Sequence, residues 1–153
     1  QEVHKMAINQ AVCATFKEQL LLAEHSLTAN TINLALYTSS ATLDANTTAY
    51  SATNEVGNSG TYAAGGGTLA SATVGLTKTS ATASTAFVDF ANLSFTSATI
   101  SAQAALIYNR SGTANVNAAV AVLDFGGVKT STNGTFTIQF PTNNATSAIL
   151  RLS

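Results

Sequence analysis

The sequence predicts a mainly β protein, a single antiparallel β-sandwich or jelly-roll-like domain with one amino-terminal α-helix. Seven or eight short segments alternate apolar and polar residues, which is the period of a half-buried strand. The segments between them hold the Gly, Asn and Ser residues that turns require. Only one segment carries a helical period, and a chain of 153 residues fits one core.

The helix is expected at about residues 10–27, before the first strand. Apolar residues recur there at spacings of three and four, which places them on one stripe of an amphipathic helix. Leu21 and Leu22 widen this stripe beyond a single seam. We expect the stripe to cover one end of the core, and contact with a partner subunit is the alternative. The stripe residues are Cys13, Phe16, Leu20, Ala23 and Leu27.

After Ser26 the apolar period changes to two and stays there, which predicts strands along the rest of the chain. The apolar alternation changes phase between Phe90 and Leu93. A turn or bulge is therefore needed near Ala91, so that the apolar residues before and after it both face the core. Pro141 ends the strand that precedes it, because proline has no N–H to donate. The predicted strands are residues 31–38, 68–76, 86–91, 93–101, 104–109, 118–125, 135–140 and 148–152.

The connections differ in length. Residues 57–67, 110–117 and 126–134 have the composition of turns. Residues 39–67 are long, polar and without periodicity, which is typical of a functional loop or of an arm ordered by a neighbour. Residues 6–153 are predicted to form one domain, whereas residues 1–5 precede Met6 and are interpreted as an extension or a tag remnant.

The composition excludes several classes of function. The chain has six basic and seven acidic residues and a net charge of −1, and its charged fraction of 8% compares with roughly 25% in ordinary domains. Six basic residues cannot form the stripe that a nucleic-acid binder needs. Neither a run of about 20 apolar residues nor a signal peptide is present, so we expect no membrane contact. A single cysteine, Cys13, permits no internal disulfide and favours folding in the cytoplasm.

Histidine and cysteine residues do not cluster in the sequence. His4 and His25 lie near the amino end, and no zinc-ligand spacing occurs. Asp44 begins a pattern like a calcium loop, but the later ligand positions are missing and an Asx turn is the alternative. These residues predict no metal site.

Asp89 and Asp124 interrupt apolar strands. A carboxylate in such a place is more often an acceptor for backbone N–H groups than an acid catalyst, although either one could pair with Arg110 or Lys129. With so few titratable residues, we expect neither an enzyme nor a cofactor.

Short motifs spread along the chain carry a resemblance to a known family. They are residues 16–20 with His25, and residues 34–43, 47–50, 55–56, 60–62, 64–66, 87–90, 105–109, 121–126 and 134–141. Together they resemble a family of small structural proteins from tailed bacteriophages, over nearly everything from Met6 to Ser153 but not over residues 1–5. The resemblance implies a virion-associated protein without enzymatic activity. We interpret it as a capsid decoration or cement subunit.

The leading hypothesis is a virion structural protein that stabilises the head shell of a tailed phage by multivalent contacts. Its partners would be the major capsid protein or other virion subunits and further copies of itself, with no nucleic acid and no membrane. It would fold in the host cytoplasm and end in the virion. The candidate interaction surface comprises Leu20, Leu21, Leu22, Tyr50, Glu55 and Tyr62.

Two alternatives remain open. The same β-domain could be a tail, neck or fibre-associated subunit or could form a filament. It could also be a carbohydrate-binding adhesin domain in which exposed tyrosines stack on sugars, namely Tyr37, Tyr50, Tyr62 and Tyr108.

Overall fold

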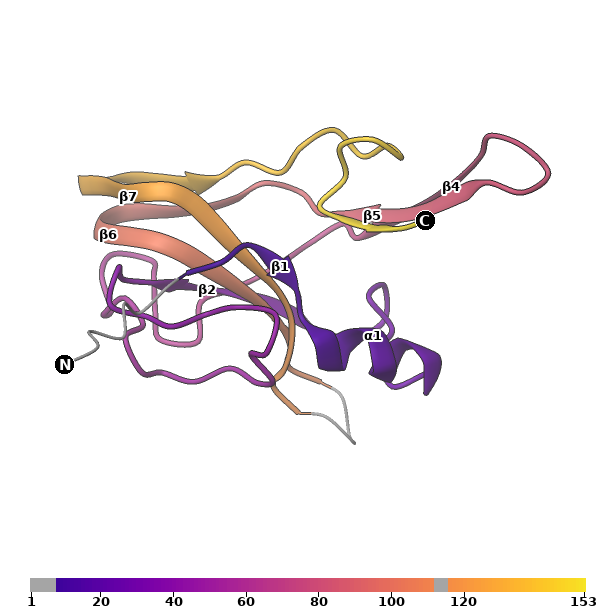
Figure 1. The fold of residues 1–153 in the computed structure, drawn as a ribbon. Coiled ribbons are helices and arrows are strands. Elements are labelled where there is room, and N and C mark those ends of the chain that lie inside the picture. The colour runs from indigo at the N-terminus through magenta and orange to yellow at the C-terminus, as the bar shows by residue number, and fades with distance from the viewer. Residues whose placement is uncertain (1–7, 112–115) are drawn as a thin grey trace, which may run out of the picture.

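The computed structural model describes residues 8–111 and 116–153. These residues form two antiparallel sheets and one short helix, joined by turns and loops (Figure 1). Strands take up 49% of the described residues and helix 6%, which confirms the predicted mainly β fold. The larger sheet has the strand order β1-β7-β6-β2-β3 and the smaller sheet β4-β5-β8. The elements are β1 (Ala11–Val12), α1 (Ala14–Leu21), β2 (Ile32–Tyr37), β3 (Gly67–Thr68), β4 (Thr73–Lys78), β5 (Ser84–Asp89), β6 (Leu93–Asn109), β7 (Ala118–Ile138) and β8 (Leu150–Leu152).

The helix is shorter than the predicted residues 10–27. Residues 11–12 form strand β1, which pairs with β7, and the Cys13 N–H then donates to the Val120 carbonyl at 2.9 Å. This pairing with the sheet overrides the helical period at the start. At the other end Ala23 has a φ of 58°, which a continuing right-handed helix does not allow.

Strands β6 and β7 form one long, curved hairpin of 17 and 21 residues (Figure 1). The strands predicted at 93–101 and 104–109 are therefore one strand, β6, and those predicted at 118–125 and 135–140 are one strand, β7. The turn predicted at residues 126–134 is wrong. Gly126 and Gly127 have φ values of 71° and 145° and lie where the pairing register with β6 shifts. Their conformational freedom serves a bulge that bends a continuous strand, and not a turn that ends it.

The chain changes sheets twice between β3 and β6. The strand predicted at 68–76 is divided between β3, which pairs with β2, and β4, which pairs with β5. The predicted break near Ala91 is confirmed, because β5 ends at Asp89 and β6 begins at Leu93 in the other sheet. Strands β4 and β5 form a hairpin that projects from the rest of the fold (Figure 1).

Residues 39–66 fold back over the open edge of β2. The Val56 N–H donates to the Leu36 carbonyl at 2.9 Å, and the Thr38 N–H donates to the Asn54 carbonyl at 3.0 Å. Backbone groups of an edge strand are thereby covered instead of being left open to another chain. The segment is ordered by the chain's own sheet, which corrects the expectation of an arm ordered by a neighbour. Its buried apolar residues are Ala41, Leu43, Val56 and Tyr62.

Candidate interaction surface

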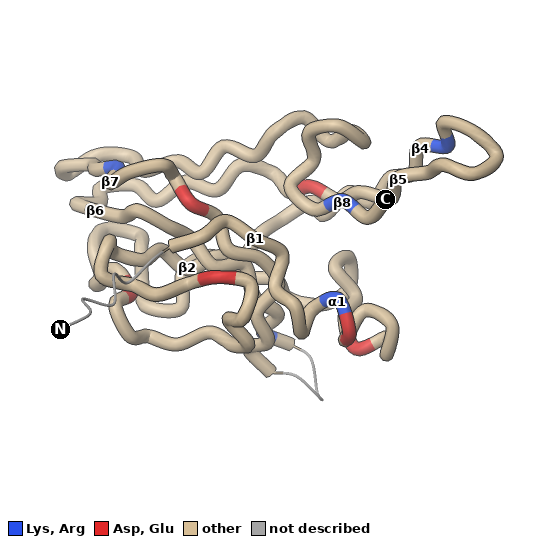
Figure 2. Tube along the Cα trace, viewed as in Figure 1, with Lys and Arg blue, Asp and Glu red and all other residues tan. Residues whose placement is uncertain are grey.

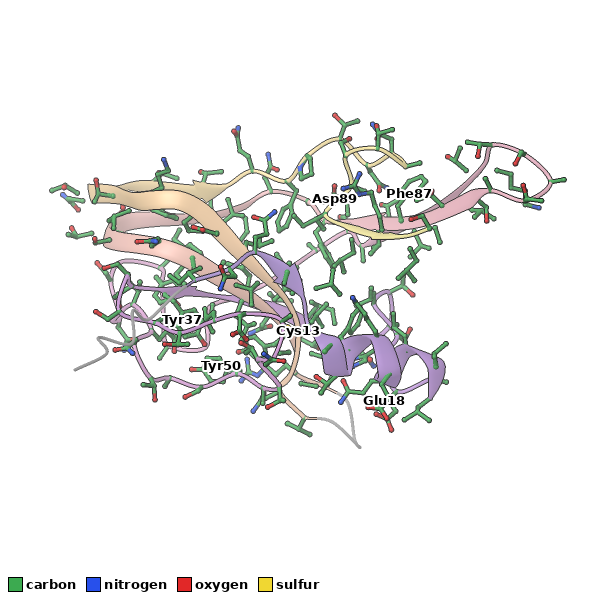
Figure 3. All side chains as sticks on the ribbon, viewed as in Figure 1. Cys13, Glu18, Tyr37, Tyr50, Phe87 and Asp89 are labelled. Carbon is green, nitrogen blue, oxygen red and sulfur yellow. The ribbon has the colours of Figure 1, made fainter. Side chains whose placement is uncertain are left out.

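The six residues predicted as an interaction surface lie in two separate places. Tyr50, Glu55 and Tyr62 belong to the segment that covers the β2 edge, and Leu20 to Leu22 lie at the end of α1. Figure 3 labels Tyr37 and Tyr50 at the larger sheet, away from the helix that carries Glu18. The two groups therefore need separate accounts.

Glu55 is the centre of an internal hydrogen-bond cluster. Its Oε1 accepts from the Tyr62 hydroxyl at 2.7 Å and from the Gly65 N–H at 2.7 Å, and its Oε2 accepts from the Tyr50 hydroxyl at 2.6 Å. The Tyr62 hydroxyl also accepts the Leu36 N–H of β2 at 2.8 Å. We name Tyr50, Glu55, Tyr62 and Gly65 the Glu55 cluster.

Tyr62 is 1% exposed, so its assignment to an interaction surface is wrong. Its ring packs edge-on against Phe95 with a centroid distance of 4.9 Å, and its hydroxyl joins the β2 edge to Glu55. A tyrosine in a polar segment thus serves to attach that segment to the sheet, because a buried hydroxyl needs partners on both sides.

The phenols of the Glu55 cluster remain neutral donors. Burial raises the pKa of Tyr50 and of Tyr62 well above the ordinary value, and the adjacent Glu55 carboxylate raises both further. Neutral phenols donating to a carboxylate form strong, charge-assisted hydrogen bonds. The cluster therefore stabilises the covering segment.

The exposed aromatic patch required for stacking on sugars is absent from the four tyrosines. Tyr37 and Tyr108 are each 2% exposed, and Tyr50 is half-buried and stacks on Tyr108 at 4.7 Å. Tyr62 is buried as well, so three of the four tyrosines have no exposed ring face, and one face of the fourth, Tyr50, is covered by Tyr108.

The leucines of α1 do reach the surface. Leu21 is 90% exposed and Leu22 61% exposed, whereas Leu20 is half-buried against the core. Their exposure is what an interaction surface requires, and contact with a partner stays a prediction.

An apolar groove of about 110 Å³ lies between α1 and the smaller sheet. Leu20 and Phe16 of the helix form one wall, and Val88 and Leu150 belong to the other. Three further apolar side chains of this sheet are 54% to 60% exposed, and sequence reasoning did not single them out; they are Val74, Leu76 and Leu152.

We call Leu21, Leu22, Val74, Leu76 and Leu152 the apolar face. Val74 and Leu76 are two positions apart on β4, so they lie on the same side of the sheet. The alternation that indicated a strand here was visible in the sequence, but it cannot tell which side of a strand faces the core. Within residues 8–111 and 116–153, charged residues are few and scattered over the fold (Figure 2).

The described residues contain no group of three or more His, Cys, Asp or Glu that could hold a metal ion. The His25 ring bonds Gln19 and Asn109 at 2.8 and 2.9 Å. Cys13 is fully buried, and burial raises the pKa of its thiol to about 11, with a smaller contribution from Asp44. Neither residue is arranged as a catalytic base or nucleophile.

The aspartates act as backbone acceptors. The Asx turn at Asp44 is confirmed, because its Oδ1 accepts the Asn46 N–H at 2.7 Å. Asp124 accepts the Gly126 N–H at 2.9 Å and so supports the bulge of β7. Asp89 accepts the Phe90 N–H at 3.0 Å where the chain leaves β5.

No model of a protein family, no curated protein and no solved structure matches this chain. No helix in residues 8–111 and 116–153 is long and apolar enough to cross a membrane.

Proposed function

We propose that this chain is a virion structural protein of a tailed bacteriophage, a decoration or cement subunit that binds the major capsid protein and stabilises the head shell. On this proposal the chain folds in the host cytoplasm and becomes part of the virion. The resemblance of its motifs to small phage structural proteins supports the assignment.

The apolar face is the observation that carries the proposal. Leu21 is almost fully exposed, Leu22 and Leu76 are exposed, and so are Val74 and Leu152, which line the groove between α1 and the smaller sheet. Covering a side chain of this size stabilises a complex by about 1.5–3 kcal/mol before the cost of association. A surface with few charges also has little to desolvate when a neighbour covers it.

A shell offers many identical sites, which suits a modest interface. One contact through the apolar face would be weak, but a subunit that touches two neighbouring shell proteins gains from the high effective concentration of the second site. The projecting β4–β5 hairpin would let one domain reach beyond its own footprint (Figure 1).

The number of copies in purified particles tests the proposal. Quantitative mass spectrometry of virions from the phage that encodes the chain should find hundreds of copies per head. Six or twelve copies, or a number that follows tail length, would replace the shell assignment by the tail, neck or fibre alternative. Absence from purified particles would refute both.

A double substitution tests whether the apolar face is the contact. Leu21→Ser with Leu22→Ser should leave the free energy of unfolding within about 0.5 kcal/mol of the wild type, because both side chains are exposed. Occupancy on particles should fall at least tenfold. Val128→Ser is the matched control, since Val128 is 48% exposed on β7 and outside the apolar face. Equal occupancy of the double variant and the control would contradict this surface.

A further inference from the structure

Strand β4 is an open edge of the smaller sheet. The sheet order β4-β5-β8 places β5 on one side of β4 and no described strand on the other. None of the residues Thr73–Lys78 is buried, and the β4–β5 hairpin projects from the rest of the fold (Figure 1). The strand therefore adds no buried side chain to the core of its own chain, and it leaves a row of backbone groups open.

The pairing with β5 determines which backbone groups of β4 face outward. The Thr79 N–H donates to the Ala83 carbonyl at 2.9 Å where the hairpin turns, and the register with β5 is regular along the whole of β4. Hydrogen-bonded pairs recur at every second residue of an antiparallel ladder, so the odd-numbered residues of β4 bond to β5. The N–H and C=O groups of Val74, Leu76 and Lys78 therefore point away from it.

This edge lacks the features that usually prevent strands of different chains from pairing. Natural edges carry several charges, a proline or a bulge, or are covered by another segment. Residues 39–66 cover the edge of β2 in this way. Strand β4 has a regular register, no proline and a single charge, Lys78, at its end. The edge is therefore suited to accept another strand.

We propose that two copies of the chain pair through β4, antiparallel and with a two-fold axis at Gly75. In this register Val74 of one copy lies opposite Leu76 of the other, and each such pair exchanges two backbone hydrogen bonds between outward-facing groups. Lys78 lies opposite Ala72, so like charges do not meet. Moving the axis to Leu76 would set Lys78 opposite Val74 and so lose an apolar pair. The self-complementary register is the reason for choosing a second copy as the partner.

Pairing joins two three-stranded sheets into one sheet of six strands. Val74 and Leu76 point to the same side of β4, and opposite residues of an antiparallel pair share a side. The apolar faces of the two copies therefore meet across the axis and form one surface. Three strands are close to the minimum for a stable sheet, so the added strands also stabilise the projecting hairpin. The pairing does not depend on the proposed shell contact and occurs in the free protein.

Disulfide trapping tests both the pairing and its register. Position 73 lies opposite position 77 of the other copy, in a non-hydrogen-bonded pair with a Cα separation of about 4.5 Å, which a disulfide can span. Thr73→Cys chains mixed with Thr77→Cys chains should form a covalent dimer on oxidation. Either variant alone should form less than a fifth as much, because positions of the same number lie about 13 Å apart along the strands. The native Cys13 is buried and does not compete. A mixture that forms no more dimer than the single variants would overturn the proposal.

Two double substitutions with the same loss of apolar side chains separate this pairing from non-specific association. Val74→Lys with Leu76→Lys sets like charges opposite each other across the axis, whereas Val74→Glu with Leu76→Lys sets opposite charges there. Both side chains are exposed, so both variants should fold. The net charge of −1 becomes +1 in the first variant and stays −1 in the second, so overall repulsion between copies is equal in size.

Sedimentation equilibrium measures the outcome. The wild type should dimerise as its concentration rises, and the like-charge variant should dimerise at least about tenfold more weakly than the opposite-charge variant. A wild type that stays monomeric up to about 1 mM would overturn the proposal. Equal dimerisation of the two double variants would overturn it as well.

Discussion

Replacing Tyr62 by Phe tests whether the Glu55 cluster holds residues 39–66 on the larger sheet. The substitution removes one hydroxyl and little volume. That hydroxyl accepts the Leu36 N–H at 2.8 Å and donates to Glu55 Oε1 at 2.7 Å, so both partners lose a bond in the interior. The apolar contact of the ring with Phe95 remains.

The two lost bonds set the magnitude. A buried N–H without an acceptor costs about 1–3 kcal/mol, and a hydrogen bond to a charged group contributes about 1.5–3 kcal/mol. Glu55 keeps the bonds from Tyr50 and from the Gly65 N–H, which reduces the second contribution. We therefore expect Tyr62→Phe to lower the free energy of unfolding by about 2–4 kcal/mol, which corresponds to a fall in Tm of about 5–15 °C.

Urea unfolding followed by circular dichroism measures this loss, and Tyr50→Phe is the matched control. Tyr50 donates to the same carboxylate, but it is half-buried, so water can replace its bond and the loss should be about 1 kcal/mol or less. Hydrogen exchange should also show faster exchange at the Leu36 amide in Tyr62→Phe. Equal effects of the two substitutions, or a loss below about 0.5 kcal/mol for Tyr62→Phe, would refute the role of the cluster.

Three further predictions concern single residues. Gly66→Ala should lower the free energy of unfolding by about 2–4 kcal/mol, because a Cβ at its φ of 74° is strained and collides with the β2 backbone. Gly57→Ala is the control: it has open space around it and should change the free energy of unfolding little in the same urea titration. Cys13 should resist alkylation in the folded protein at pH 8, since its buried thiol has a pKa of about 11, and complete labelling without urea would contradict its burial. Burial lowers the pKa of His25, so the unfolded state binds a proton more readily than the folded state. The free energy of unfolding should therefore fall as the pH drops through 6.5, because protonation of His25 breaks the hydrogen bond from Asn109. A urea midpoint that stays constant from pH 7.5 to 5.5, or the same pH profile in His25→Gln, would contradict this.

Local patterns in the sequence were sufficient to find the main strands but not their ends. The alternation over residues 31–38 locates β2, which the structure places at Ile32–Tyr37. Gly126 and Gly127 were misinterpreted as a turn because the same positive φ values serve a turn or a bulge. The difference depends on whether β6 continues alongside, and that is a contact between distant segments.

The interaction surface was only partly predictable, because contacts between distant segments leave no local pattern in the sequence. Leu21 and Leu22 stood out because they exceed what one helical stripe can bury. Tyr62 was misassigned because only its contact with the β2 edge shows that it is internal.

Electron cryo-microscopy of intact particles from the phage that encodes this chain tests the proposed function most directly. The account predicts density for this fold at repeated positions on the head, with Leu21, Leu22 and Leu76 covered by a neighbouring subunit. Particles without such density, or with the domain bound so that these side chains face solvent, would contradict it.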